Sequence, residues 1–180
     1  MEKKKVLLLC VSICLFSVSC RKSDNKSANA VLEYNISFDE LVHYLPPNGP
    51  IVKNEKAHSG IYCLMSDSTH VYNAVFESKL QDIGNKSINK VIVEGYIKQS
   101  SVNAKGCFVI SVQDPTGKAT DWAGSEIKKD AKSTDGWMPF KMEVPLKPES
   151  KNPDAIIKLY AWNNNSSDQT FFDDIHVIFQ

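Results

Sequence analysis

The chain has 180 residues with 21 basic and 21 acidic side chains, so its formal net charge at pH 7 is zero. Nucleic-acid binding depends on clustered Lys and Arg that neutralise phosphates, so a neutral chain without a basic block argues against a nucleic-acid partner. The length suits one domain with a substantial hydrophobic core.

The first residues have the pattern of an export signal. Lysines occupy positions 3–5, and an apolar run follows at residues 6–18 that is too short to span a bilayer stably. The run ends where small residues precede Cys20, an arrangement that resembles a bacterial lipobox. The resemblance implies a signal peptide at residues 1–19, lipidation of Cys20 and attachment to the membrane of the cell envelope by lipid alone. Arg21 is compatible with the outer membrane, where we expect the protein. The alternative is an ordinary secretory signal with an incidental cysteine.

Removal of the signal takes away three lysines and one glutamate, which leaves a net charge of −2. Residues 20–30 are then the lipidated cysteine and a polar segment without periodicity, which we interpret as a flexible tether. Residues 31–180 form the folded domain. Its two cysteines, Cys63 and Cys107, could form one disulfide in an oxidising envelope. We favour the alternative in which each is a small buried hydrophobe within its own strand.

Short runs rich in β-branched and aromatic residues follow one another along the domain, separated by turn signals. One helical turn is expected at residues 38–44. Many short strands at this spacing predict an all-β sandwich or barrel. The predicted strands are residues 61–65, 73–76, 90–98, 106–113, 137–144, 155–162 and 170–179.

Side chains alternate between the two faces of a strand. In two predicted strands, 90–98 and 155–162, the aliphatic residues occupy one face, which should meet the core. Aromatic and charged residues occupy the other face and should point outward. This outward set is Glu94, Tyr96, Lys98, Tyr160 and Trp162.

The last predicted strand has one residue that conflicts with its apolar face. Alternation places Phe171, Ile175, Val177 and Phe179 toward the core, and Asp173 falls among them, whereas Phe172 falls on the opposite face. A bare buried charge is too costly, so the carboxylate of Asp173 must be paired, hydrogen-bonded or bound to a metal.

Several short pieces together resemble a known family. Phe38 and Asp39 stand near the first strand, residues 57–62 (AHSGIY) lead into a strand, and Trp137 opens another. Residues 159–163 (LYAWN) and 172–175 (FDDI) follow later. In this order and spacing, residues 35–180 resemble carbohydrate-binding modules of the galactose-binding-like jelly-roll group, such as the CenC-like modules. The resemblance implies a single jelly-roll β-sandwich and a poly- or oligosaccharide ligand.

Members of this group often carry a structural calcium ion. Carried over to this sequence, its ligands are Asp39, backbone oxygens near Ser59 and Gly60, and Asp173. Calcium accepts mixed shells of carboxylate and carbonyl oxygens, and its presence would explain an inward Asp173. The alternative is that Asp173 accepts hydrogen bonds from a loop backbone without any metal.

A sugar site needs flat aromatic faces that pack against a pyranose and polar groups that hold its hydroxyls. The outward set offers this chemistry if its two strands are neighbours in one sheet. Trp122, in a loop predicted at residues 117–125, is a further candidate. Trp137 is expected in the core. For each of these aromatics, packing within the fold is the alternative to ligand contact.

The sequence lacks the common catalytic motifs. Its four histidines do not have the spacing of a zinc site, and no G-x-S-x-G or phosphate-binding glycine loop is present. Glu94 and Asp174 are conceivable as the carboxylate pair of a small glycoside hydrolase, which we favour less. We expect a non-catalytic glycan-binding lipoprotein of the bacterial envelope.

The alternative from another class is a structural or assembly lipoprotein that binds a second envelope protein. An open aromatic groove would favour a sugar, whereas aromatics under a loop or in a flat apolar patch would favour a protein partner.

Overall fold

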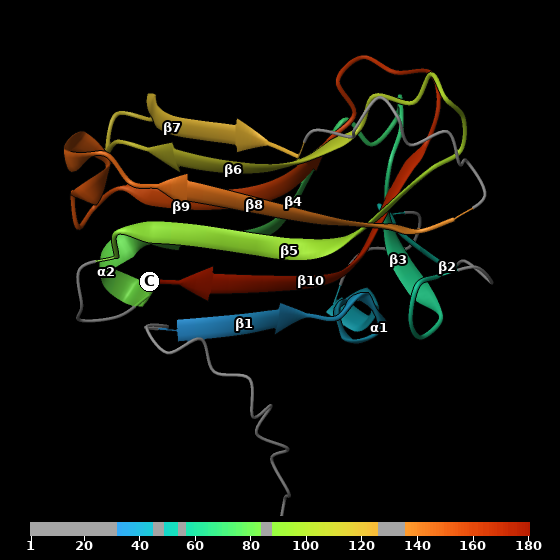
Figure 1. Cartoon of the computed structure of the whole chain (residues 1–180), viewed down its shortest axis with the longest axis horizontal. Coiled ribbons are helices and arrows are strands. Elements are labelled where there is room, and N and C mark those ends of the chain that lie inside the picture. Colours follow the sequence, from blue (N-terminus) through green and yellow to red (C-terminus); the bar gives the residue numbers. More distant parts are fainter. Residues whose placement is uncertain (1–31, 45–48, 54–56, 84–87, 126–135) are drawn as a thin grey trace, which may run out of the picture.

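Two antiparallel β-sheets pack face to face in a computed structural model that describes residues 32–44, 49–53, 57–83, 88–125 and 136–180 (Figure 1). The predicted signal peptide, Cys20 and the tether lie outside the described residues. Within these described ranges, no helix is long and apolar enough to cross a membrane. The all-β, single-domain jelly-roll sandwich expected from the sequence is confirmed.

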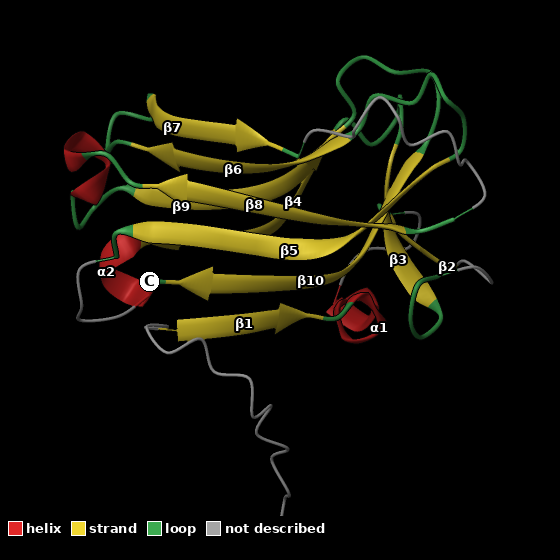
Figure 2. Ribbon diagram, in the orientation of Figure 1, coloured by secondary structure: helices red, strands yellow, loops and turns green. Residues whose placement is uncertain are grey.

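Over the residues that the structure describes, sheet A has six strands and sheet B has four (Figure 2). All strand pairs are antiparallel. The order in sheet A is β2 (Ile51–Lys53), β3 (Tyr62–Ser66), β10 (Thr170–Phe179), β5 (Lys90–Gln99) and β8 (Met138–Pro145), and β1 (Leu32–Ile36) also pairs with β10. The order in sheet B is β4 (Tyr72–Lys79), β9 (Ile156–Trp162), β6 (Cys107–Gln113) and β7 (Ala119–Gly124). The short helices are α1 (Phe38–Leu41), η1 (Val42–Tyr44), α2 (Leu80–Ile83) and η2 (Pro148–Lys151).

Each predicted strand is present, with ends that differ by a few residues. The predicted helical turn is present as α1 and η1, but α2 and η2 were not expected. Strands β1 and β2 were not predicted. The loop predicted at residues 117–125 was wrong, because strand β7 lies there. The sequence of β7, ATDWAG, has little strand propensity. It is a strand because it pairs with β6.

The core lies between the sheets and follows the predicted alternation in β5 and β9. Ile157, Leu159 and Ala161 of β9 are fully buried, as are Val91 and Val93 of β5. Full burial of an aliphatic or aromatic side chain stabilises the fold by about 1.5–3 kcal/mol. These strands therefore hold their outward residues on fixed faces of the sandwich.

A β-bulge changes the face of the residues in β10. Phe172 pairs with Ile97 and is fully buried in the core, whereas Asp173 pairs with Tyr96 on the outer face of sheet A. The register shifts between Asp173 and His176, and Asp174 within the bulge has φ of 49°. The prediction that Phe171 and Asp173 face the core was therefore wrong, because the bulge inserts a residue and shifts the alternation. The prediction holds after the bulge, where Ile175, Val177 and Phe179 are buried in the core.

Cys63 in β3 and Cys107 in β6 are buried, and no disulfide joins them. The interpretation of these residues as small buried hydrophobes is confirmed. Burial raises the pKa of the Cys107 thiol to about 11, so the reactive thiolate is rare at neutral pH.

Candidate functional site

The outward residues predicted as one site belong to two different sheets. Glu94, Tyr96 and Lys98 lie on β5 in sheet A, whereas Tyr160 and Trp162 lie on β9 in sheet B. The two strands are not neighbours, and their outward residues occupy opposite faces of the sandwich. The prediction of a single site made by all five residues was therefore wrong.

Sheet B carries a cluster of four aromatic side chains on its outer face. We call it the aromatic platform: Tyr72, Trp122, Tyr160 and Trp162. The rings of Tyr72 and Trp162 are nearly parallel, with an interplanar angle of 8° and 6.2 Å between centroids. Trp122 stands almost perpendicular to Trp162, at 81° and 6.2 Å. The side chains of Tyr72 and Trp122 are the most open, with 68% and 52% of their surface exposed.

Strand pairing brings these residues together from distant parts of the sequence. Tyr72 of β4 lies directly opposite Trp162 of β9, and Cys107 of β6 lies opposite Trp162 on its other side. Tyr72 was missed because the predicted strand began one residue later, at Asn73. The neighbouring tyrosine in the sequence was a signal, but only the register places it beside Trp162.

Trp122 and Tyr160 meet above β6. The indole Nε1 of Trp122 donates a hydrogen bond to the Tyr160 hydroxyl at 3.3 Å. Val109 and Ser111 of β6 pair with Tyr160 and Trp122 respectively, and only 0% and 2% of their surfaces are exposed. Both face outward, since Phe108, Ile110 and Val112, which alternate with them along β6, belong to the core, and the two rings lie over them. The hydrogen bond fixes the orientation of the Trp122 ring.

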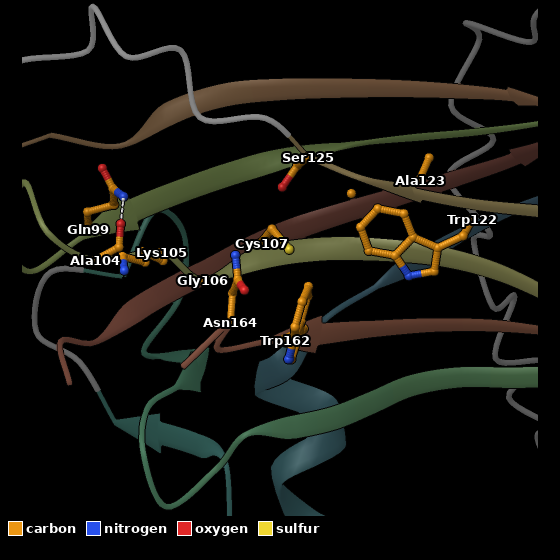
Figure 3. A pocket seen from close by; sticks show the side chains of 11 residues that line it. Gln99, Ala104, Lys105, Gly106, Cys107, Trp122, Ala123, Ser125, Trp162 and Asn164 are labelled. Carbon is orange, nitrogen blue, oxygen red and sulfur yellow. Dashed lines mark hydrogen bonds between the residues drawn. The ribbon is translucent and has the colours of Figure 1, made fainter. Parts of the chain in front are cut away.

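A pocket of about 510 Å³ adjoins the platform where β6 begins and β7 and β9 end (Figure 3). Trp122 and Trp162 line the pocket, and so does Cys107, the cross-strand partner of Trp162. Polar groups at its rim come from Lys105 and Asn164. The pocket therefore combines aromatic faces with a cation and an amide.

The outer face of sheet A also carries aromatic residues, and their rings pack against other side chains of that face. The imidazole of His58 stacks on Tyr96, with centroids 3.4 Å apart and an interplanar angle of 16°. Trp137 contacts His58 edge to face, and the ammonium group of Lys98 lies 6.0 Å from the Trp137 ring. Trp137 is half-buried on this face and is not part of the buried core, so its prediction as a core residue was wrong.

The two carboxylates of the suspected hydrolase pair lie on this face of sheet A as well. Glu94 forms an ion pair with Lys141 at 2.7 Å. Asp174 accepts hydrogen bonds from Ser59 Oγ at 2.5 Å and lies 2.6 Å from Nδ1 of His58. Both acids thus hold side chains of the fold in place.

The predicted calcium ligands Asp39 and Asp173 both contact the segment of residues 58–62. Oδ1 of Asp39 accepts hydrogen bonds from the backbone N–H groups of Ile61 and Tyr62, at 2.8 and 3.3 Å. Oδ2 of Asp173 accepts them from His58 and Ser59, at 2.9 and 3.2 Å. Burial raises the pKa of the Asp173 carboxyl, and the backbone N–H groups oppose this rise.

The contacts of Asp39 and Asp173 can be compared with the ligand shell that a calcium ion requires. The partners of both carboxylates are N–H donors, whereas a calcium shell is made of oxygens. Among the residues with a described position, no group of three His, Cys, Asp or Glu side chains is placed to hold a metal. Calcium at Asp39, Ser59, Gly60 and Asp173 stays a prediction, and the aromatic platform does not depend on it.

Neither a protein-family model nor a curated protein sequence matches the chain. Among solved structures, the CBM22-1 xylan-binding domain from Paenibacillus barcinonensis Xyn10C is similar, with a TM-score of 0.49 and 13% identity over 81% of this chain and 92% of that chain. The CBM22-1–GH10 modules of Clostridium thermocellum endo-1,4-β-D-xylanase 10B, complexed with xylohexaose, have a TM-score of 0.46 and 11% identity over 82% of this chain and 26% of that chain.

The infectious bursal disease virus VP2 subviral particle is similar to a comparable degree, with a TM-score of 0.43 and 15% identity over 82% of this chain and 32% of that chain. A shared fold does not fix a ligand, which depends on the residues at the surface of each protein.

Proposed function

We propose that this domain binds a glycan, with the aromatic platform and its pocket as the binding site. The observation that carries the proposal is the gathering of Tyr72, Trp122, Tyr160 and Trp162 on one open sheet face. Flat aromatic rings are suited to pack against the apolar face of a pyranose. A cluster of partly exposed aromatics on a soluble domain marks a contact surface.

The shape of the site favours a small or narrow ligand over a protein. A volume of about 510 Å³ lies within the usual range for small-molecule sites. A protein partner buries a wide and mostly flat area. Here, by contrast, the surface is not flat, because the Trp122 ring is nearly perpendicular to the Trp162 ring beside it. Lys105 and Asn164 at the rim offer hydrogen bonds to sugar hydroxyls.

Under this proposal, the aromatic residues on the outer face of sheet A have a structural role. Because His58 covers Tyr96 and Trp137 lies against His58, these rings stabilise the fold rather than bind the sugar. Glu94 and Lys98 accompany them on that face and are not assigned to the glycan site. The proposal involves no catalytic step.

A glycan array tests the proposal directly. The chain from Arg21 onward, produced without the lipidated cysteine, is applied to plant and host polysaccharides with and without calcium. We expect binding to at least one class of glycan. A folded β-sheet spectrum with no binding in either condition would contradict the proposal and would favour a protein partner.

We further propose that Cys20 anchors the protein to the bacterial envelope, at the outer membrane. The support is the lipobox-like sequence that ends at this cysteine. Replacement of Cys20 by alanine in the full chain should abolish labelling by a radioactive fatty acid and release the protein from the membrane fraction. A labelled or membrane-bound variant would contradict the anchor.

A further inference from the structure

A buried carboxylate lies next to Trp122 in the sequence and on the other face of strand β7. Asp121 is only 6% exposed, and it pairs with Val112 of β6, which belongs to the core. Successive residues of a strand point to opposite faces, so Asp121 points inward whereas Trp122 points outward to the aromatic platform. Resting on the proposed function, we propose that Asp121 is a positioning residue of the glycan site, which anchors β7 from the inner side and so holds Trp122 in the platform.

Strand β7 is held only weakly by its own pairing. It is the last strand in the order of sheet B, and its partner among the described strands is β6 (Figure 1). Its ladder with β6 is irregular between Val112 and Gln113, beside Asp121. Its sequence has little strand propensity. Because an edge strand has hydrogen-bonding partners on one side only, the contacts of its inner face help to decide where its side chains lie.

Asp121 makes these contacts with the segment that joins β8 to β9. Its Oδ2 accepts hydrogen bonds from the backbone N–H of Lys147, at 3.1 Å, and from the hydroxyl of Ser150 in η2. Its Oδ1 lies 3.4 Å from the ammonium group of Lys147, which also donates to the backbone oxygen of Thr120 at 3.2 Å. Since β8 belongs to sheet A and β9 to sheet B, the segment connects the two sheets. Asp121 therefore attaches the edge strand to a part of the fold that both sheets hold in place.

The Asp121 carboxyl is charged at neutral pH despite its burial. Burial by itself would raise its pKa, but the hydrogen bonds from Ser150 and Lys147 and the positive charge of Lys147 lower the pKa below its usual value. Hydrogen bonds to an ionised acceptor are stronger than those between neutral groups. A buried carboxylate that loses them is left unsatisfied, which is costly. Movement of β7 away from η2 is therefore opposed.

The contacts of Asp121 act on Trp122 through the backbone that the two residues share. Asp121 is bonded on the inner side to Lys147 and Ser150, whereas the indole of Trp122 donates to Tyr160 on the outer side. A displacement of β7 would carry the indole away from the Tyr160 hydroxyl. A ligand would then have to order the Trp122 ring as it binds, which lowers the affinity.

Two substitutions on the inner side test this role without changing any ring of the platform. Ser150→Ala removes one donor to Asp121 and is the milder variant, and Asp121→Asn removes the charge. Ser66→Ala is the matched control, because Ser66 of β3 in sheet A is also fully buried and donates one hydrogen bond, to the backbone oxygen of His70 at 3.3 Å.

Three measurements are made on each variant and on the wild-type chain. Urea unfolding gives the free energy of unfolding. Proton–nitrogen NMR gives the indole N–H signals of the three tryptophans, in which the signal of Trp122 is assigned by its loss in Trp122→Phe. Titration calorimetry gives the Kd for cellohexaose, xylohexaose, mannohexaose, maltohexaose and any glycan bound on the array.

We expect Ser150→Ala and Asp121→Asn to shift the indole signal of Trp122, to speed its exchange with solvent and to raise the Kd severalfold. Ser66→Ala should lower the free energy of unfolding while the Trp122 signal and the Kd stay as in the wild type. If both inner-side variants lose stability but keep the wild-type Trp122 signal and Kd, the positioning role is overturned and Asp121 only stabilises the fold. If Asp121→Asn does not fold, the milder Ser150→Ala decides in the same way. The NMR measurement needs no ligand, so failure of the proposed function is seen separately, as no binding of any of these glycans by the wild-type chain.

Discussion

Replacement of Trp162 by alanine is expected to remove the floor of the glycan site while leaving the sandwich folded. A tryptophan presents roughly 150–250 Å² to its neighbours, so a sugar on one ring face covers roughly 80 Å² of it. At about 25 cal/mol per Å² this contact contributes about 2 kcal/mol. Since about 1.4 kcal/mol corresponds to a tenfold change, the Kd should rise roughly thirtyfold.

The same substitution also affects folding, which the assay must separate from binding. Trp162 contacts the rings of Tyr72 and Trp122, and each aromatic pair contributes about 0.5–1.5 kcal/mol. Calorimetric titration gives the Kd, and urea unfolding gives the free energy of unfolding. Trp137→Ala is the matched control, because Trp137 is a half-buried tryptophan on the opposite face. The reasoning would be refuted if Trp162→Ala left the Kd unchanged, or if Trp137→Ala raised it equally.

The remaining predictions concern stability. The Asp67 carboxylate is partly desolvated, but hydrogen bonds from Thr69 and His70 lower its pKa to about 2. Because this pKa lies below the unfolded value of 3.8, the carboxylate stabilises the fold at neutral pH, and this contribution is lost as the pH falls through 2. Asp67→Asn should therefore lower the free energy of unfolding, measured in urea, by about 2 kcal/mol at pH 7 and by little at pH 2. An equal decrease at both pH values would contradict this role of the carboxylate. Gly60 has φ of 61°, and a Cβ atom there would lie 1.9 Å from Asp39 Oδ2, so Gly60→Ala should cost more than about 2 kcal/mol. Gly117 has φ of 87°, and a Cβ atom there would have no atom within 4 Å, so Gly117→Ala should lower the free energy of unfolding by only about 1 kcal/mol. Equal decreases for the two glycine variants would argue against a clash with Asp39. If calcium binds at Asp39 and Asp173, the melting temperature in the presence of calcium should exceed the melting temperature in the presence of a chelator. Equal melting temperatures would contradict the predicted calcium site.

The strands of the sandwich were predictable wherever aliphatic residues alternate with polar or aromatic ones. The pattern of β9 shows which residues face the core and that Tyr160 and Trp162 point outward. The same reasoning was wrong for Asp173, because a bulge in β10 reverses the alternation and a bulge leaves no simple mark in the sequence. It was also wrong for Trp122, whose strand forms by pairing with β6 rather than by its own propensity.

The candidate site was only partly predictable for a related reason. Trp122, Tyr160 and Trp162 were recognised as aromatics suited to a sugar, but Tyr96 was grouped with them. The local pattern specifies the face of a strand and not the sheet to which the strand belongs. Sheet membership is set by long-range pairing, which placed β5 and β9 in different sheets.

Local alternation sets which side chains can be buried together, so the all-β class, most of the strands and the buried faces of β5 and β9 follow from the sequence. Three contacts follow from the folded domain instead: Tyr72 stacks with Trp162, Trp122 donates a hydrogen bond to Tyr160, and His58 stacks on Tyr96. Each of these contacts joins residues far apart in the chain or depends on strand register. Such contacts arise from the packing of the whole domain, and no short segment of the sequence encodes them.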